Sequence, residues 1–206
     1  FDPDLIADGN RAALHDARTQ IERLKRRLSD PAKAKILVAQ QELLDDPELI
    51  NQAIESSITP TRTVEIMFQL MLGSLQAGLA FSNASLGAVH AMSHSMGGLL
   101  DLPHGECNSI LLEHIIRINF DTVPERYRDI AKQLGLSVDN VSNFLLLEMI
   151  IDRIASIRSS LNIPASIKVA GLSEQTVDYL VENALNDPCM VTNPRILTKE
   201  EVRSIY

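Results

Sequence analysis

The chain has 206 residues, is 45% hydrophobic and carries a formal net charge of -8 at pH 7. This length is enough for one large or two small domains, and the negative charge disfavours nucleic acid as a partner. The two cysteines make at most one bridge, no signal peptide opens the sequence, and no apolar run approaches membrane-spanning length. We therefore expect a cytoplasmic protein that binds neither nucleic acid nor membrane.

The first part of the chain has the pattern of a helical hairpin. Apolar residues recur at spacings of three and four between residues 14 and 28, where charged residues flank them. Ser29-Asp30-Pro31 ends this helix and starts a second one that runs to about Leu44. Asp45-Asp46-Pro47-Glu48 combines a capping residue with proline at the first helical position, so it predicts a third, short helix.

The remainder of the chain is also predicted to be helical, because no segment alternates with period two. The predicted helices run from Thr59-Pro60 to about Phe81, from about Ser85 to Met96, from Gly105 to about Asn119, from the capping box Thr122-Val-Pro-Glu125, from about Asn140 to Leu161, from near Ser173, and from the capping box Thr198-Lys-Glu-Glu201. The predicted fold class is all-α, a multi-helix bundle. A composition shift near residues 56–63 divides it into a helical segment, 1–57, and a larger domain, 58–206.

Three of the five histidines lie close together, in the run from Ala88 to Cys107. His90 and His94 are four residues apart, so on a helix they share a face. We expect Gly97-Gly98 to stop that helix and a turn at Pro103 to bring His104 back to face the first pair.

Such a group of imidazoles is what a catalytic metal site needs. Two nitrogens can bind a divalent ion while the third handles protons, because imidazole is a common metal ligand that also titrates near neutral pH. Histidines among apolar residues are also common as satisfied core residues, but their concentration around Gly-Gly and Pro favours a functional site. Cys107 has ligand-like spacing from His104, although a free buried thiol is the commoner outcome.

Several runs resemble the iron-containing (group III) alcohol dehydrogenases. They are Leu72-Gly-Ser-Leu-Gln-Ala-Gly-Leu-Ala-Phe-Ser-Asn-Ala-Ser-Leu-Gly87, the histidine run, Asn108-Ser-Ile-Leu-Leu-Glu-His114 and Val191-Thr-Asn-Pro-Arg195. These motifs extend from about Met71 to Tyr206, and the family's C-terminal helical domain would cover about residues 60–206. The resemblance implies hydride transfer between NAD(P) and a small alcohol or aldehyde. It also implies that His90 and His104 are metal ligands and that His94 relays a proton beside the nicotinamide.

Two features of that family are missing from the sequence. Two further ligands come from a Gly-x-Asp-Ala-x-x-His pattern, whose closest local match is Gly9-Asn-Arg-Ala-Ala-Leu-His15, with Arg11 in place of the carboxylate. No glycine-rich turn follows a strand to cradle a dinucleotide. We therefore expect Fe(II) or Zn(II) to bind weakly, with Asp101 or Glu106 as speculative substitute ligands, and NAD(P) not to bind this chain, whose activity is in doubt.

A second resemblance covers the first 57 residues. The run from Ala34 to Ile54, preceded by a charged amphipathic helix, resembles the helical HPr-binding subdomain of enzyme I of the sugar phosphotransferase system. The phosphorylated histidine of that family belongs to another subdomain, so His15 has no such role. A capped turn between two core helices would give the same pattern. The alternative function is therefore a non-catalytic helical interaction module or a fusion, which self-associates or binds a partner protein through residues 1–57.

Overall fold

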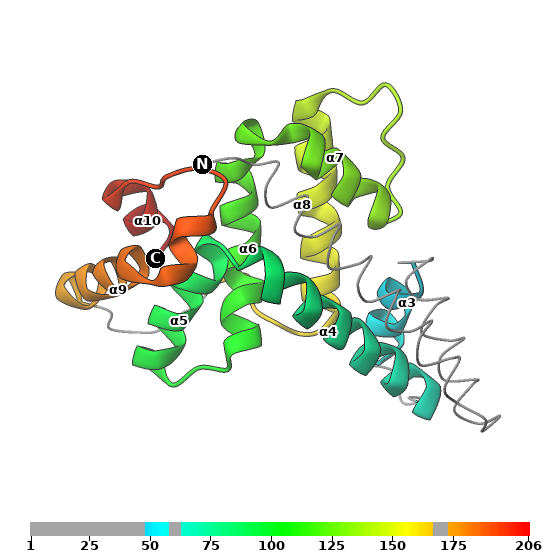
Figure 1. Cartoon of the computed structure of the whole chain (residues 1–206), viewed down its shortest axis with the longest axis horizontal. Coiled ribbons are helices and arrows are strands. Elements are labelled where there is room, and N and C mark those ends of the chain that lie inside the picture. The colour runs from blue at the N-terminus through cyan, green and yellow to red at the C-terminus, as the bar shows by residue number, and fades with distance from the viewer. Residues whose placement is uncertain (1–47, 58–62, 167–172) are drawn as a thin grey trace. The chain divides into compact units, whose positions relative to one another are not determined.

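The computed structural model describes residues 48–57, 63–166 and 173–206 (Figure 1). The helices predicted before Leu44 and the start predicted at Thr59-Pro60 lie outside these residues. All regular elements in the described ranges are helices, which confirms the all-α prediction. The chain divides into two compact units: the first includes the described residues 48–57, 63–84 and 133–135, and the second is formed mainly by residues 85–132 and 136–206. The boundary predicted between residues 57 and 58 stays a prediction.

The first unit contains helix α3 (Glu48–Ser57), which packs against helix α4 (Val64–Ala84). Helix α4 extends three residues beyond the predicted end at Phe81. Its stretch Val64–Ser82 is long and apolar enough to cross a membrane, so the expectation that no run approaches that length is wrong. Almost all of the polar residues in this stretch are uncharged, so its mean hydropathy stays high enough for a membrane-spanning helix. One such helix is weak evidence for a membrane segment.

The second unit contains the remaining elements. These are α5 (Ala88–Leu100), α6 (His104–Asn119), the 3-10 helix η1 (Phe120–Thr122), α7 (Pro124–Gln133), α8 (Asn143–Ser160), α9 (Glu174–Asn186), the 3-10 helix η2 (Pro188–Thr192) and α10 (Lys199–Ile205). Ser173 caps α9 by accepting a hydrogen bond from the Thr176 amide, and Thr198 and Glu201 form the predicted capping box of α10. Because residues 120–122 form a 3-10 turn, α7 begins at Pro124, one residue after the start that a Thr122 cap predicts.

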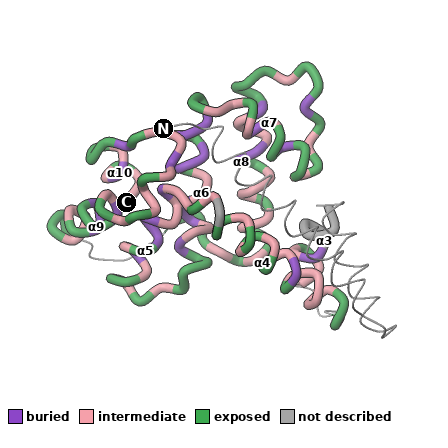
Figure 2. The backbone as a smooth tube through the Cα atoms, in the orientation of Figure 1, coloured by how far each residue is buried: buried purple, intermediate pink, exposed green. Residues whose placement is uncertain are grey.

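Helix α5 lies in the middle of this unit. It packs against α6, α9 and η2, while α10 packs on α9 and α8 on α6. Many of the buried segments lie where these helices meet (Figure 2). The core consists of mostly apolar side chains that all face this junction: Ala88, Met92, Met96, Cys107, Leu111, Ile115, Val181, Ala184, Leu197 and Val202. Burial of this apolar surface is the main force that assembles the unit.

The two glycines of the histidine run do not stop the helix, so that prediction is wrong. Helix α5 continues through Gly97 and Gly98 to Leu100, and Asp101 ends it in the left-handed conformation, at φ 54°. Each glycine costs about 1 kcal/mol relative to alanine, which the buried contacts of α5 offset. A β-carbon on Gly97 would lie 3.2 Å from the Leu102 carbonyl oxygen. Gly97 therefore lets the next loop fold back closely over the helix.

A buried asparagine links three parts of this unit. The Asn193 side chain is 3% exposed; its Oδ1 accepts hydrogen bonds from the Ala88 amide at 3.2 Å and from Asn119 Nδ2 at 2.9 Å. Its Nδ2 donates to Asn119 Oδ1 at 2.9 Å and to the Arg195 carbonyl at 2.7 Å. The N-cap residue Gly87 has no side chain to satisfy the first amides of α5, so Asn193 does so from a distant part of the chain.

We expect Asn193→Ala to lower the free energy of unfolding by about 2–4 kcal/mol, because it leaves the buried amide of Ala88 without a partner and removes two hydrogen bonds from Asn119. Urea unfolding monitored by circular dichroism measures this change. Asn186→Ala is the matched control. Asn186 is exposed and bonds only within its own helix, so this variant should stay within about 0.5 kcal/mol of the parent. Equal losses in both variants would contradict the role given to Asn193.

Gly97 and Gly98 provide a matched pair for the loop contact. Gly98→Ala should stabilise the protein by about 0.5–1 kcal/mol, since alanine favours the helix and a β-carbon there meets nothing within 4 Å. Gly97→Ala should stabilise the protein less than Gly98→Ala does, or destabilise it, because the new β-carbon presses on the Leu102 carbonyl. Thermal unfolding of the two variants tests the difference, and an equal gain in both would refute the close approach at Gly97.

Candidate metal centre

The structure brings the three predicted histidines together. His90 and His94 lie one turn apart on α5, and His104 is the first residue of α6, directly after Pro103. The ring centroids are 6.2 Å apart for His90 and His94, 5.3 Å for His90 and His104, and 5.2 Å for His94 and His104. The turn at Pro103 therefore returns His104 to the first pair, although α5 ends later than predicted.

Asn108, one turn into α6, connects two of these rings. Its Nδ2 lies 3.3 Å from His90 Nε2 and 3.0 Å from His104 Nε2, while its own Oδ1 is buried without a hydrogen-bond partner. An amide nitrogen only donates, so the Nε2 atoms of both rings act as acceptors and direct their lone pairs at one point. Sequence reasoning missed this residue. Its position four residues after His104 on the same helix was the available signal.

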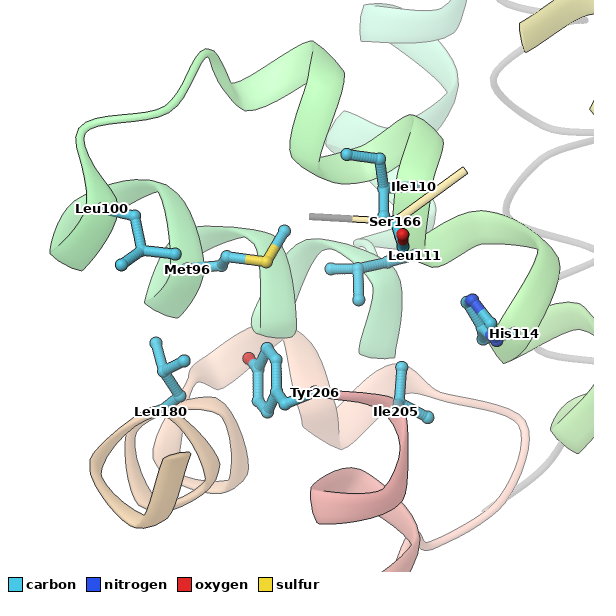
Figure 3. A pocket seen from close by; sticks show the side chains of 9 residues that line it. All are labelled: Met96, Leu100, Ile110, Leu111, His114, Ser166, Leu180, Ile205 and Tyr206. Atoms are coloured by element: carbon cyan, nitrogen blue, oxygen red, sulfur yellow. The ribbon is translucent and has the colours of Figure 1, made fainter. Parts of the chain in front are cut away.

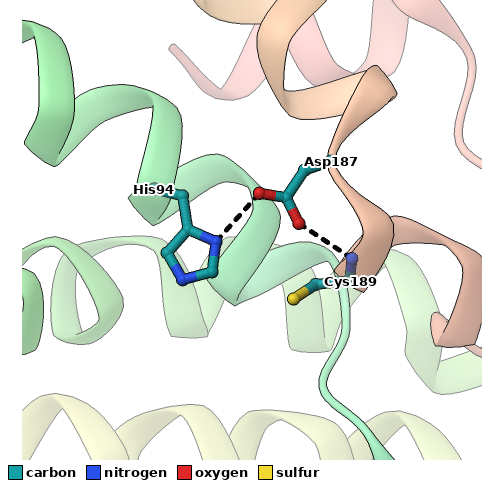
Figure 4. A group of neighbouring side chains, drawn as sticks. All are labelled: His94, Asp187 and Cys189. Carbon is teal, nitrogen blue, oxygen red and sulfur yellow. Dashed lines mark hydrogen bonds and ion pairs between the residues drawn. The ribbon is translucent and has the colours of Figure 1, made fainter.

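A carboxylate and a thiol lie next to His94 (Figure 4). His94 Nδ1 is 2.9 Å from Asp187 Oδ2, and Asp187 Oδ1 accepts a hydrogen bond from the Cys189 amide at 2.8 Å. The carboxylate bonded to a histidine is thus Asp187. Asp101 is instead the exposed C-cap of α5, and Glu106 is exposed in the first turn of α6. The sequence signal that could have pointed to Asp187 was the Asp187-Pro188 pair, which caps η2 just before the Val191–Arg195 motif.

The cysteines have different surroundings. Cys107 is a free thiol, fully buried in the core, as the sequence suggested. Cys189 is also free but only partly buried, and it belongs to the cluster around His94. Burial and the neighbouring Asp187 carboxylate raise the pKa of the Cys189 thiol, so this side chain is protonated at neutral pH in the absence of a cation.

The electrostatics of the site favour protonation states of His90 and Asp187 that can bind a metal ion. Burial, together with the charges that His104 and His94 would carry, lowers the pKa of His90, which favours the neutral imidazole that binds metals. Burial raises the pKa of Asp187, but hydrogen bonds from the Cys189 amide and His94 outweigh that effect and leave the pKa below its ordinary value. The site therefore holds a carboxylate and a neutral imidazole at pH 7.

The donor set fits a transition-metal ion. Imidazole nitrogen, carboxylate oxygen and thiolate sulfur are all ligands of Zn(II), and imidazole also binds Fe(II). The lone pairs of His90 and His104 already converge, and the buried, unpartnered Oδ1 of Asn108 lies beside them. Chemically, an ion here would polarise an oxygen ligand, with His94 and Asp187 next to it.

A separate apolar pocket of about 80 Å³ opens between α5, α6, α9 and α10 (Figure 3). Met96, Leu111 and Tyr206 line it, and the Tyr206 hydroxyl donates to the Met92 carbonyl. This volume is well below the roughly 300–1,000 Å³ of common small-molecule sites, so the pocket is too small for a dinucleotide.

The described residues form a helical bundle that gathers three imidazoles at a helix–turn–helix junction. The chain is a member of the Fe-containing alcohol dehydrogenase family, since the model of that family's C-terminal domain matches residues 44–206. This confirms the first resemblance. A model described as PEP-utilising enzyme, N-terminal, matches residues 7–65 and supports the second resemblance. The two matches overlap, so they do not fix a domain boundary.

Known relatives agree with this assignment. The chain is 35% identical over 158 residues to a 1,3-propanediol dehydrogenase of Citrobacter freundii and 33% identical over 159 residues to a lactaldehyde reductase of Escherichia coli strain K12. Each alignment covers 77% of this chain and 41% of the relative. An alcohol dehydrogenase from Oenococcus oeni superposes with a TM-score of 0.72 at 31% identity, over 85% of this chain and 44% of that one. The chain thus spans less than half the length of these relatives.

The lowered pKa of Asp187 predicts a pH dependence. Its folded-state pKa lies below the ordinary value of 3.8, so its charge stabilises the fold above that pH, and the contribution is lost as the pH falls through the folded-state pKa. We expect Asp187→Asn to lower the free energy of unfolding at pH 6 and to have a smaller effect once the pH has fallen below the lowered folded-state pKa of Asp187, where both side chains are neutral. Urea unfolding of both proteins at several pH values measures the difference, and a constant difference would exclude a role for the charge.

Proposed function

We propose that this chain provides the metal-binding part of an alcohol dehydrogenase or aldehyde reductase that works with NAD(P). The observation that carries the proposal is the convergence of three imidazoles within 5.2–6.2 Å of one another in a member of the Fe-containing alcohol dehydrogenase family. Relatives named 1,3-propanediol dehydrogenase and lactaldehyde reductase support a small alcohol or aldehyde as the substrate class.

In this proposal, His90 and His104 hold Fe(II) or Zn(II). Their Nε2 atoms already point to one place, and Asn108 keeps both rings oriented in the absence of an ion. The bound ion supplies Lewis acidity, which lowers the pKa of an alcohol oxygen and polarises an aldehyde carbonyl. Two protein ligands bind more weakly than the usual three or more, so we expect modest affinity unless neighbouring donors contribute.

His94 accepts or returns the hydroxyl proton of the substrate. Its ring is 43% exposed, which gives a small molecule access, and its Nδ1 contacts Asp187. A carboxylate at Nδ1 orients the ring and stabilises the imidazolium formed when the other nitrogen takes a proton. Asp187 is therefore a positioning residue for His94, held in turn by the Cys189 amide.

The proposal includes a nicotinamide cofactor because the chain belongs to the Fe-containing alcohol dehydrogenase family. A homologous fold, sulfoacetaldehyde reductase of Bifidobacterium kashiwanohense, has been solved in complex with NAD+. That these residues alone bind NAD(P) poorly stays an expectation, which rests on the missing glycine-rich turn after a strand.

Metal affinity of histidine variants tests the proposal. We expect His90→Ala and His104→Ala each to weaken Fe(II) binding about tenfold or more, because each removes one of two converging donors. Equilibrium dialysis under anaerobic conditions, followed by elemental analysis, measures the affinity.

His114→Ala is the matched control for this experiment. His114 is on α6 too, ten residues beyond His104 and therefore about 15 Å farther along the helix. Its removal should leave the Fe(II) affinity unchanged. If all three variants bind Fe(II) as the parent does, the histidine cluster is not the iron site and the proposal fails.

A further inference from the structure

His94, Asp187 and Cys189 form a cluster that the proposed iron ligands do not use. One potential ligand atom from each residue lies within 4.8 Å of the corresponding atoms of the other two. A metal ion with ligand bonds of roughly 2.0–2.3 Å needs its donors about 3–4 Å apart. The three side chains are thus close enough to share one ion after small rotations.

The backbone builds this cluster from two packed elements. Asp187 is the N-cap of η2, where its Oδ1 accepts from the Cys189 amide at 2.8 Å, so these two residues have a fixed relation. His94 is on α5, which packs against η2. The Asp187 side chain is 16% exposed and Cys189 is partly buried, so these two residues would shield a bound ion from water on one side, while His94 is exposed. A pair of surface acids would offer neither the fixed geometry nor this shielding.

The chemistry of the donors selects the ion. One nitrogen, one oxygen and one sulfur ligand suit a borderline-soft cation, and a thiolate favours Zn(II) over the hard ions Mg(II) and Ca(II). We propose that His94, Asp187 and Cys189 bind one divalent cation of the Zn(II) class, at a site separate from the His90–His104 pair.

Such binding would regulate the proposed reaction. The ion replaces the hydrogen bond between His94 and Asp187 with bonds to the metal, and the Cys189 thiol releases its proton to solvent. His94 is then no longer free to handle the substrate proton. This regulatory consequence rests on the proposed function, but the binding site itself does not.

Titration with Co(II), a spectroscopic substitute for Zn(II), tests the site in the full chain. We expect a thiolate-to-cobalt charge-transfer band in the near ultraviolet that Zn(II) abolishes by competition. Cys189→Ser should remove the band and weaken Zn(II) binding by about tenfold or more, and Asp187→Asn should weaken it as well. Cys107→Ala is the matched control, because Cys107 is the other free thiol and lies in the core; it should keep the band.

His90→Ala separates this proposal from the iron site. The separate site predicts that His90→Ala keeps the cobalt band and that Zn(II) still abolishes this band by competition, even where the variant loses Fe(II). Loss of the band in His90→Ala, with circular dichroism showing an intact fold, would place the ion at the histidine pair and overturn the proposal. The absence of a band in the parent, or a Zn(II) affinity unaffected by Cys189→Ser, would overturn it equally.

Discussion

The hydrogen bonds of Asn193 are the interaction on which the rest of the second unit depends. This single buried amide satisfies the first amide of α5, pairs with Asn119 at the end of α6 and holds the backbone at Arg195. In the same region, Thr192 donates to the Leu86 carbonyl just before α5. A buried polar group with a full set of partners fixes a geometry more strictly than apolar contacts alone, because every alternative arrangement leaves it unpaired.

This linkage fixes the positions from which the candidate metal site is built. It ties the start of α5, which presents His90 and His94, to the end of η2, whose N-cap is Asp187 and whose second residue is Cys189. The Leu102 loop closes over Gly97 and delivers His104 to the same place. The donors therefore come from three elements whose mutual arrangement depends on packing within one unit.

The sequence predicted the helices and the histidine cluster well because both have local signals. Cap residues such as Ser173 and Thr198 act within one helical turn, and the spacing of His90 and His94 follows from helical geometry. The end of α5 was misjudged because Gly97 responds to the distant contact with Leu102, and tertiary packing overrode its low helix propensity. Asp187 and Asn193 were not assigned, because a local signal such as Asp-Pro does not identify hydrogen-bond partners that lie 93 and 105 residues away in the chain.

The most direct test of this account is hydrogen exchange of the Ala88 amide, measured by nuclear magnetic resonance. The first amides of a helix have no partner within the helix and normally exchange quickly. Because the Ala88 amide donates to the buried Asn193 side chain, we predict that it exchanges only when the unit unfolds globally, as slowly as the amides of the core. Exchange at the rate of an ordinary exposed first-turn amide would contradict the account, since α5 would then not be anchored by Asn193.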